Sequence, residues 1–381
     1  MAPELAMVAG EASGDMLAAH VLHALRDLRP QWRAAGIGGA AMQREGLTSW
    51  WPLERLAVNG FAAVLPRLPE LLWMRASLRR RLLREPPAVF VGVDAPDFNL
   101  ALEQRLRAAA IPTVHFISPS IWAWRRERIR GIERAVDRLL CVFPFEPALY
   151  AGTRVQASYI GHPLAEVVAL QPDRGVARAA LGLDDTAPVI AVLPGSRRGE
   201  VQHIGAAFLG AAAQLQRRRG ARIVVPVAHP GLAPLLQQQA QAWPQLQVHW
   251  LAGGAQQALA ACDGALVASG TATLECALFK RPMVIGYRLP ALSWWLMKDR
   301  GYLPWVGLPN ILAGASLVPE LLQQACTPGA LADALLAQLD DAPRCAELRE
   351  RFTVLHEQLR RPTAQLAAQA IAEAAREGGR R

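Results

Sequence analysis

The stretch of residues 264–287 constrains the fold most, because it reads as a buried strand, a tight turn, a helix and a second buried strand. The apolar run 265–268 ends at Ser269-Gly270-Thr271, and Pro282 ends the helix. A helix that opens directly after a strand leaves unpaired N–H groups and a partial positive charge at the sheet edge, which suits a diphosphate. Glu275, one turn into the helix, has the reach to bind a ribose diol. A plain helix cap at Ser269 or Thr271 is the alternative at this point.

The order of the remaining segments predicts two domains of the same kind. Short apolar runs alternate with amphipathic segments, as in parallel sheets covered by helices on both faces. The expected strands are residues 5–9, 34–37, 88–93, 113–117, 138–142 and 156–160 in the first half, and 189–193, 223–227, 247–251, 265–268 and 283–286 in the second. We therefore expect an α/β protein with two doubly wound, Rossmann-like domains that face a cleft at the carboxyl ends of their strands.

The chain length of 381 residues agrees with two domains, since it exceeds the length that usually folds around a single hydrophobic core. We place an N-terminal acceptor-binding domain at residues 1–170, a C-terminal nucleotide-binding domain at 171–350 and a bracing C-terminal helix at 351–381. The formal charge of +9 favours anionic partners. We find no signal sequence and no run of the ~20 apolar residues that span a bilayer, so we expect a cytoplasmic protein with reduced cysteines.

A second helix-opening loop, Leu193-Pro-Gly-Ser-Arg-Arg-Gly-Glu200, follows the expected strand 189–193. Gly195 permits close backbone approach, and Arg197 offers forked donors to phosphate oxygens, although such turns are also common as solvated surface loops. Parallel strands bring this loop to the same sheet edge as the Ser269 turn, which favours a nucleotide diphosphate. The expected nucleotide contacts are Gly195, Ser196, Ser269, Gly270, Thr271 and Glu275.

The matching edge of the first half carries Asp94. This residue ends an apolar strand and is expected to point into the cleft, where partial desolvation suits a carboxylate to the role of general base. Asp97 follows Pro96 at a position typical of a helix N-cap, so a structural role is favoured there. A base on one domain that faces a diphosphate on the other can deprotonate a hydroxyl while a nucleoside diphosphate departs.

Two further loops of the first half offer contacts to an acceptor. Gly10-Glu-Ala-Ser-Gly-Asp15 is a strand-to-helix turn, and Ser118-Pro-Ser-Ile-Trp122 brings an aromatic side chain to the end of another strand. A helix cap in the first loop and a buried tryptophan in the second are the alternatives. The candidate acceptor contacts are Glu11, Ser13, Asp15, Ser118 and Trp122.

The segment of residues 59–73 is unusually apolar for one that an arginine cluster follows. A lipid-chain groove or an interfacial membrane contact needs this combination, but a core-facing helix with a basic edge shows the same pattern. A comparable patch spans residues 290–298 and favours the lipid interpretation. The candidate lipid contacts are Phe61, Val64, Leu65, Leu68, Leu71 and Leu72.

Missing motifs argue against several other chemistries. The chain has no GxxxxGK(S/T) loop, and Gly36-Ile-Gly-Gly39 lacks the third glycine of a dinucleotide fingerprint, which weakens ATPase and NAD-dependent readings. It has no HExxH motif and no Asp-x-Asp pair for a divalent metal beside the diphosphate. We therefore expect no metal and no cofactor, with Arg197 and a helix N-terminus stabilising the leaving group.

A series of segments carries a resemblance that covers nearly the whole chain. They are residues 9–15, 94–99, 118–125, 144–146, 161–163, 193–197, 269–271 with Glu275, and 308–310. In this order they closely resemble the lipid-A-disaccharide synthase family. The resemblance implies a two-domain glycosyltransferase fold of the B type. It also implies an inverting, metal-independent transfer of 2,3-diacylglucosamine from its UDP conjugate to the 6-hydroxyl of 2,3-diacylglucosamine 1-phosphate, with release of UDP.

The resemblance also implies roles and partners. Asp94 matches the general base, Arg197 the arginine at the diphosphate and Asn310 an asparagine of the catalytic cleft. Residues 61–72 match the region that receives acyl chains. Peripheral binding to the anionic cytoplasmic face of the inner membrane and a tendency to form homodimers are implied as well, and we expect no nucleic-acid partner.

Two rival functions stay open. A UDP-sugar epimerase or hydrolase on the same fold predicts turnover of the nucleotide sugar without a lipid acceptor. A non-catalytic, UDP-binding, membrane-associated module predicts binding of UDP without its release from a sugar. Asp94 at the opposite cleft edge argues against the module, because binding alone does not need a base there.

Overall fold

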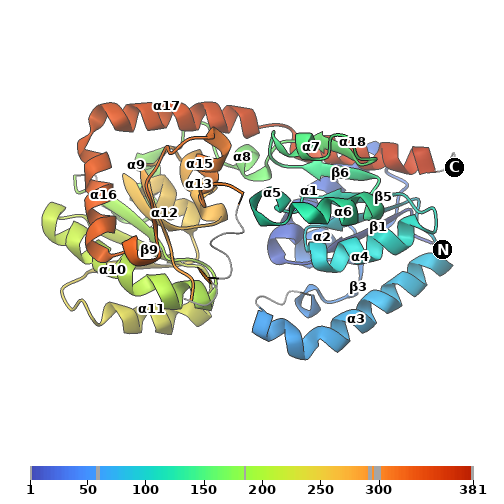
Figure 1. The fold of residues 1–381 in the computed structure, drawn as a ribbon, viewed down its shortest axis with the longest axis horizontal. Coiled ribbons are helices and arrows are strands. Elements are labelled where there is room, and N and C mark those ends of the chain that lie inside the picture. Colours follow the sequence, from blue (N-terminus) through green and yellow to red (C-terminus); the bar gives the residue numbers. More distant parts are fainter. Residues whose placement is uncertain (1, 57–60, 184–185, 291–293, 296–301, 379–381) are drawn as a thin grey trace. The chain divides into compact units, whose positions relative to one another are not determined.

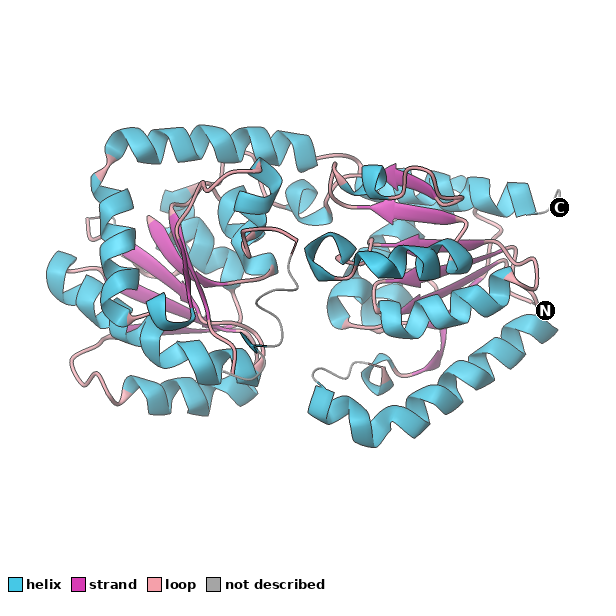
Figure 2. Ribbon diagram, viewed as in Figure 1, coloured by secondary structure: helices cyan, strands magenta, loops and turns pink. Residues whose placement is uncertain are grey.

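The computed structural model describes residues 2–56, 61–183, 186–290, 294–295 and 302–378. The chain divides into two compact units (Figure 1). The first unit comprises Met1–Glu166 together with Leu359–Arg381, and the second comprises Val167–Gln358. Each unit contains its own parallel sheet with helices on its faces (Figure 2).

The sheet of the first unit has seven parallel strands in the order β3-β2-β1-β4-β5-β6-β7. Their bounds are β1 Leu5–Ala9, β2 Ala34–Ile37, β3 Thr48–Trp51, β4 Val89–Val93, β5 Thr113–Phe116, β6 Arg138–Cys141 and β7 Gln156–Tyr159. Every residue of β1 and β4 is buried, as expected for central strands that are covered on both faces.

The helices of this unit bury both faces of the sheet. They are α1 Ala12–Leu28, α2 Ala40–Arg44, η1 Leu53–Arg55, α3 Phe61–Arg84, α4 Pro96–Arg107, α5 Ile121–Trp124, η2 Arg126–Arg128, α6 Ile129–Ala135, α7 Glu146–Leu149 and α18 Thr363–Gly378, with α8 Pro163–Val167 at the unit boundary. One core joins Met74, Leu78 and Leu82 of α3 to Phe90 and Leu102. The C-terminal helix α18 packs against α1 and strands β4, β5 and β6.

The sheet of the second unit has six parallel strands in the order β10-β9-β8-β11-β12-β13. Their bounds are β8 Val189–Leu193, β9 Arg222–Val227, β10 Val248–Ala252, β11 Gly264–Ala268, β12 Met283–Tyr287 and β13 Glu320–Leu322. The helices are α9 Arg174–Ala180, α10 Arg198–Arg219, η3 Pro230–Leu232, α11 Ala233–Ala240, α12 Ala255–Ala261, α13 Thr271–Leu278, α15 Leu308–Ala313, η4 Gln323–Ala325, α16 Pro328–Asp340 and α17 Ala342–Leu359. Phe208 of α10 lies at the centre of a core shared with α16.

The prediction of two doubly wound α/β sheets is confirmed. The order of each sheet reverses beside its first strand, at β1 and β4 in the first unit and at β8 and β11 in the second. Loops that follow strands on either side of such a reversal diverge and leave room for a ligand. None of the helices within the described ranges is both long and apolar enough to span a bilayer.

Candidate active site

A cavity of about 470 Å³ lies at the carboxyl ends of β8, β9 and β11 in the second unit. All the nucleotide contacts predicted from the sequence line it together with Arg197. The loop before α12 adds Gly253 and Gly254, which sequence reasoning missed. Both glycines have positive φ angles, so their backbone forms a tight turn at the cavity wall. The two loops that the sequence singled out therefore meet in one pocket.

The N-terminus of α13 forms one side of this pocket. Gly270 precedes the helix with a φ of +139°, and the first N–H groups of the helix have no intrahelical partner, as at any helix start. The Ser269 hydroxyl donates to the Val306 carbonyl at 2.8 Å, and the Leu308 N–H donates to Thr273 Oγ1 at 3.2 Å. Ser269 and Thr273 thus hold residues 306–308 beside the turn, while the backbone N–H groups stay available to an anion.

The Arg197 loop forms the opposite side and is closed by Glu200. Glu200 Oε2 accepts hydrogen bonds from the N–H groups of Ser196 at 3.1 Å and Arg197 at 3.2 Å, and Oε1 accepts from Arg197 Nη1 at 3.0 Å. The carboxylate therefore already caps the N–H groups that we expected a phosphate to bind. Most of the Arg197 guanidinium remains exposed and can donate to a ligand. The sequence signal for this cap is the spacing of three residues between Arg197, at the helix start, and Glu200.

Glu275 supplies the hydrogen-bond acceptor of the pocket. Its Oε1 accepts from Gln256 Nε2 at 3.2 Å, and burial raises the pKa of its carboxyl above the usual value of 4.5. A partly buried carboxyl that has one protein donor keeps acceptor capacity for hydroxyl groups. This arrangement suits a ribose next to a diphosphate.

Asp94 lies in the first unit, directly after β4 and partly exposed. Asp94 and Ala95 both adopt left-handed backbone conformations, with φ angles of +51° and +43°. The turn is held from the side by Gly10, where an added Cβ would lie 2.2 Å from the Ala95 Cβ. The Asp94 carboxylate has no hydrogen-bond or ion-pair partner among the described residues. A strained turn that presents an unpaired carboxylate is typical of a functional site.

Asp97 does not cap α4, contrary to the prediction. The N-cap residue of α4 is Ala95, because Pro96 already occupies the first helical position. Asp97 lies in the first turn, where its exposed carboxylate forms an ion pair with Arg128 at 2.5 Å. Its role is structural, but through the helix start and Arg128 rather than through a side-chain cap.

Asp15 is committed to α2 rather than to a ligand. Its buried carboxylate accepts three backbone hydrogen bonds, from Gly39 at 2.7 Å, Ala41 at 3.0 Å and Met42 at 3.2 Å. The predicted cap therefore exists, but on the helix after the neighbouring strand. Of the other candidates in this loop, Glu11 is partly exposed and Ser13 is exposed.

Ser118 and Trp122 point into the protein. The Ser118 hydroxyl and the Tyr150 hydroxyl are hydrogen-bonded at 3.0 Å, and Trp122 Nε1 donates to Glu146 Oε1 at 3.2 Å. Glu146 Oε2 accepts from the N–H groups of residues 142 and 143, and burial raises the pKa of the Glu146 carboxyl to about 7. The buried tryptophan that the sequence left as an alternative is thus what the structure shows. Glu146, a residue outside our predicted site set, organises this loop.

Asn310 is fully buried, and both ends of its amide are engaged. Its Nδ2 donates to Val318 O at 2.9 Å and Glu320 Oε1 at 2.8 Å, and its Oδ1 accepts from the N–H groups of Leu317 and Val318. The Glu320 carboxylate accepts from the N–H groups of Val306 and Gly307 at 2.8 and 2.9 Å. Asn310 therefore anchors the segment that Ser269 also holds.

Helix α3 combines the two patterns that the sequence left open. Leu68, Leu72 and Trp73 are 42%, 45% and 52% exposed, whereas Met74, Leu78 and Leu82 are buried in the core. Leu71 is partly buried. The side chains of the other candidates, Phe61, Val64 and Leu65, lie outside the described residues, as does most of the patch at residues 290–298. Helix α3 thus exposes apolar side chains at residues 68, 72 and 73 and again at Leu83, which is 41% exposed, while Met74, Leu78 and Leu82 face the core.

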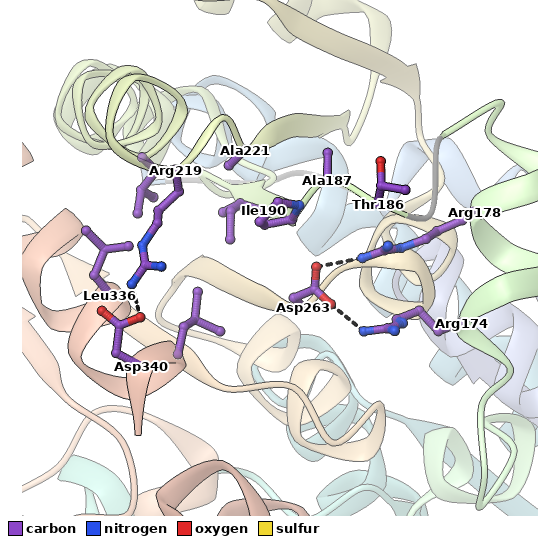
Figure 3. A pocket seen from close by; sticks show the side chains of 13 residues that line it. Arg174, Arg178, Thr186, Ala187, Ile190, Arg219, Ala221, Asp263, Leu336 and Asp340 are labelled. Atoms are coloured by element: carbon purple, nitrogen blue, oxygen red, sulfur yellow. Dashed lines mark hydrogen bonds and ion pairs between the residues drawn. The ribbon is translucent and has the colours of Figure 1, made fainter. Parts of the chain in front are cut away.

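A further pocket of about 350 Å³ lies at the opposite edge of the second sheet, where β8, β9 and β11 begin (Figure 3). Asp263 accepts hydrogen bonds from Arg174 at 2.5 Å and from Arg178 at 2.6 Å, and Arg219 is paired with Asp340 (Figure 3). These charges largely neutralise one another. The arginines of this pocket are therefore engaged in ion pairs, whereas the cavity at Arg197 includes the open N-terminus of α13.

Comparisons with known proteins agree along the whole chain. The family model described as lipid-A-disaccharide synthetase matches residues 5–375. The lipid-A-disaccharide synthase of Burkholderia thailandensis is 54% identical over 370 residues, which are 97% of this chain and 95% of that protein. The enzyme of the same name from Verminephrobacter eiseniae is 53% identical over 373 residues, with 96% of both chains covered.

Solved structures resemble the fold at low sequence identity. MurG of Acinetobacter baumannii has a TM-score of 0.60 at 14% identity and covers 97% of this chain and 99% of its own. The UDP-GlcNAc 2-epimerase of Neisseria meningitidis, solved with UDP-GlcNAc, has a TM-score of 0.63 at 12% identity and covers 98% and 99%. Together with the two parallel sheets, these similarities confirm the predicted B-type glycosyltransferase fold.

Proposed function

Because the chain belongs to the lipid-A-disaccharide synthetase family and so has lipid-A-disaccharide synthase activity, we propose that the pocket at Arg197 binds the UDP part of its sugar donor. The donor is UDP-2,3-diacylglucosamine, and the acceptor is the 6-hydroxyl of 2,3-diacylglucosamine 1-phosphate. The observation that supports this assignment is that one cavity gathers an arginine, an open helix N-terminus and a carboxyl acceptor. These groups match the diphosphate and ribose of UDP.

The diphosphate binds on the α13 side of the pocket. The N–H groups of Ser196 and Arg197 already donate to Glu200, so they do not offer a vacant anion site. The free N–H groups at the start of α13 and the exposed guanidinium of Arg197 are the remaining donors. They stabilise the negative charge that develops on UDP as the glycosidic bond breaks. Glu275 accepts hydrogen bonds from the ribose hydroxyls.

Asp94 acts as the general base. It takes the proton from the acceptor 6-hydroxyl while that oxygen forms a bond to C1 of the donor sugar. The bond from C1 to the phosphate oxygen breaks at the same time, and its electron pair leaves with UDP, which inverts the configuration at C1. The unpaired carboxylate on a strained turn supports this role. Asn310 serves as a positioning residue for residues 306–320.

The exposed apolar part of α3 binds the membrane surface that holds both lipid substrates. Leu68, Leu72 and Trp73 are exposed on the same helix as Arg75, Arg79, Arg80, Arg81 and Arg84. Apolar side chains enter the interface and arginines attract anionic head groups. We also propose that the chain forms homodimers, on the ground of the family resemblance alone.

The decisive experiment compares Asp94→Asn with Asp97→Asn. Purified protein is incubated with UDP-diacylglucosamine, with and without the acceptor and in the presence of a chelator, and disaccharide and UDP are measured by mass spectrometry. Asp94→Asn should lower kcat by roughly 10²- to 10⁴-fold, because a positioned base contributes that much. Asp97→Asn should stay near the wild-type rate, since the Asp97 side chain is exposed and, within the described part of the chain, its carboxylate pairs with Arg128 alone.

Each other outcome of that experiment has a defined meaning. A near wild-type rate in Asp94→Asn would remove Asp94 from the role of base. Release of UDP without the acceptor would favour the epimerase or hydrolase. Loss of product in the presence of chelator would overturn the metal-independent mechanism alone.

A further inference from the structure

Asn99 lies directly beneath the Asp94 turn and is fully buried. Its Nδ2 donates to Asp94 O at 2.9 Å and lies 3.3 Å from Val8 O and 3.4 Å from Val93 O. These carbonyls belong to the ends of the two central strands and to the turn itself. One amide group therefore ties the ends of β1 and β4 to the residue that we propose as the base.

The turn needs such an anchor. Left-handed conformations are unfavourable for residues with a Cβ such as Asp94 and Ala95, and they persist only where the surroundings enforce them. The backbone hydrogen bonds of the turn run from Asp94 N to Phe116 O at 2.9 Å and from the N–H groups of Phe98 and Asn99 to Ala95 O, both at 3.0 Å. Asn99 is the side chain that fixes the Asp94 carbonyl, and with it the direction of the Asp94 side chain.

A buried polar pair lies one turn along α4 from Asn99. Glu103 Oε1 and His115 Nδ1 are hydrogen-bonded at 2.8 Å, and both side chains are inaccessible to solvent. Gly92, which pairs with His115 across the sheet, makes the space for this cluster. A Cβ on Gly92 would lie 2.2 Å from Glu103 Oε1 and 2.9 Å from the Asn99 Cβ. Asn99 and Glu103 thus both pack against Gly92, in space that a side chain at that position would fill.

The cluster contains more polar atoms than packing needs. Asn99 Oδ1, Glu103 Oε2 and His115 Nε2 have no hydrogen-bond partner among the described residues. A buried polar atom without a partner loses the hydrogen bonds that water gives it in the unfolded chain, so apolar side chains of the same size would favour stability. Burial also raises the pKa of the Glu103 carboxyl. A cost of this kind next to a proposed base points to a role in the reaction.

We propose that Asn99 is a positioning residue for Asp94, supported by the buried Glu103–His115 pair, and that the rate of sugar transfer depends on this cluster although none of its members touches substrate. The inference rests on the proposed role of Asp94. It assigns to the cluster an effect on kcat that is separate from its effect on stability.

The test uses three variants of the full chain with both lipid substrates. Asn99→Asp places carboxylate oxygen where the amide nitrogen faces three carbonyl oxygens, and should lower kcat roughly 10- to 100-fold, the effect of misplacing a catalytic group by about 1 Å. Glu103→Gln keeps the shape of the side chain and should lower kcat about 3- to 10-fold. KM for UDP-diacylglucosamine should stay within about twofold, because the nucleotide pocket lies in the second unit.

Leu106→Val is the matched control for stability. Leu106 is fully buried on the same helix, one turn beyond Glu103, and has no polar contact. It should lower the melting temperature with kcat near the wild-type value. Because Asn99→Asp is expected to lower stability strongly, Glu103→Gln is compared with Leu106→Val, each at the same number of degrees below its own melting temperature. Equal kcat values in Glu103→Gln and Leu106→Val would overturn the inference.

A double-mutant cycle separates this inference from the proposed function. In the Asp94→Asn background, Asn99→Asp should cause no further loss of kcat, because its effect passes through Asp94. If Asp94→Asn is slow and the double variant loses a further factor in kcat equal to that of Asn99→Asp alone, the positioning role is overturned and Asp94 stays the base. A fast Asp94→Asn variant would overturn both proposals.

Discussion

At the scale of single residues, Gly195 shapes the loop of the proposed nucleotide pocket. Its φ of +112° is one that residues with a Cβ rarely adopt, and a Cβ would lie 2.6 Å from Glu200 Oε2. Gly195→Ala should therefore displace Ser196 and Arg197 together and weaken UDP binding by roughly tenfold or more, a loss of at least about 1.4 kcal/mol. Titration calorimetry with UDP measures this change.

Gly199→Ala is the matched control in the same loop. No atom lies within 4 Å of a Cβ at Gly199, and the residue belongs to the first turn of α10. Alanine in that place favours the helix by up to about 1 kcal/mol, so UDP affinity should not fall. Equal losses of affinity in the two variants would contradict the steric argument.

Glu146 and His162 make opposite contributions to the pH dependence of stability. Burial raises the pKa of Glu146 from 4.5 to about 7, so in this window the folded chain keeps a proton that the unfolded chain loses, and stability falls as pH rises. Burial lowers the pKa of His162 from 6.5 to about 4, so there the unfolded chain holds the extra proton, and stability rises with pH. Between pH 4.5 and 6.5 the two effects largely cancel.

Single substitutions should separate the two contributions. Relative to wild type, Glu146→Gln should gain stability from pH 5 to pH 7 and His162→Gln should lose it. Each change is at most about 3 kcal/mol, and it is smaller for His162 because that side chain is partly exposed. Urea unfolding at both pH values measures the free energy of unfolding. Changes in the same direction for both variants would show that other groups dominate.

The sequence predicted those site residues whose roles follow from local patterns. Ser269 and Gly270 follow β11 directly, Arg197 lies four residues after the end of β8, and parallel strands bring such turns together. The partners of Asp15 and Asn310 could not be predicted, because only the fold brings them within reach. They are backbone N–H groups 24 or more residues away for Asp15, and backbone groups of residues 317 and 318 together with the Glu320 carboxylate for Asn310. Glu146 was missed for the same reason, since its burial depends on the loop of Trp122.

At the scale of elements, burial decided which strands could be predicted. Strands β1 and β8 are buried throughout and appear in the sequence as continuous apolar runs. Strands β3 and β13 lie at sheet edges, are partly exposed and contain four and three residues, so they lack a distinct pattern. Helix α3 gave an ambiguous pattern because it carries both exposed leucines, such as Leu72 and Leu83, and buried ones, such as Leu78.

The proposed membrane contact of Leu68, Leu72 and Trp73 on α3 can be tested by vesicle binding. The double variant Leu72→Asp and Trp73→Asp should bind vesicles of anionic lipid at least about tenfold more weakly, because it removes apolar area and adds negative charge. Sedimentation with phosphatidylglycerol vesicles measures binding. Val354→Asp, at a position 48% exposed on α17 of the second unit, is the control. Equal binding by the double variant and the control would argue against α3 as the membrane contact.

At the scale of the whole molecule, the chain closes the first unit with its own C-terminus. Residues Leu359–Arg381 belong to that unit, although the second unit separates them from it in sequence. Ala367, Ala368 and Ile371 of α18 are buried, and Arg138 of β6 pairs with Glu373 and Glu377. The first sheet is therefore not covered until the last helix has been made.

A chain that ends at Gln358 should consequently lose the first unit and keep the second. Removing α18 exposes the apolar side chains of α1 and of strands β4 to β6, and a sheet open on one face is prone to proteolysis and aggregation. The nucleotide pocket lies wholly within residues 193–275, so UDP binding should persist. Limited proteolysis should cut residues 1–166 rapidly, whereas calorimetry should give an affinity for UDP near that of the full chain.

A chain that ends at Gly378 retains all of α18 and is the control. If both truncated chains resist proteolysis equally, α18 does not complete the first core; if the shorter chain fails to bind UDP, the second unit depends on the first for its fold.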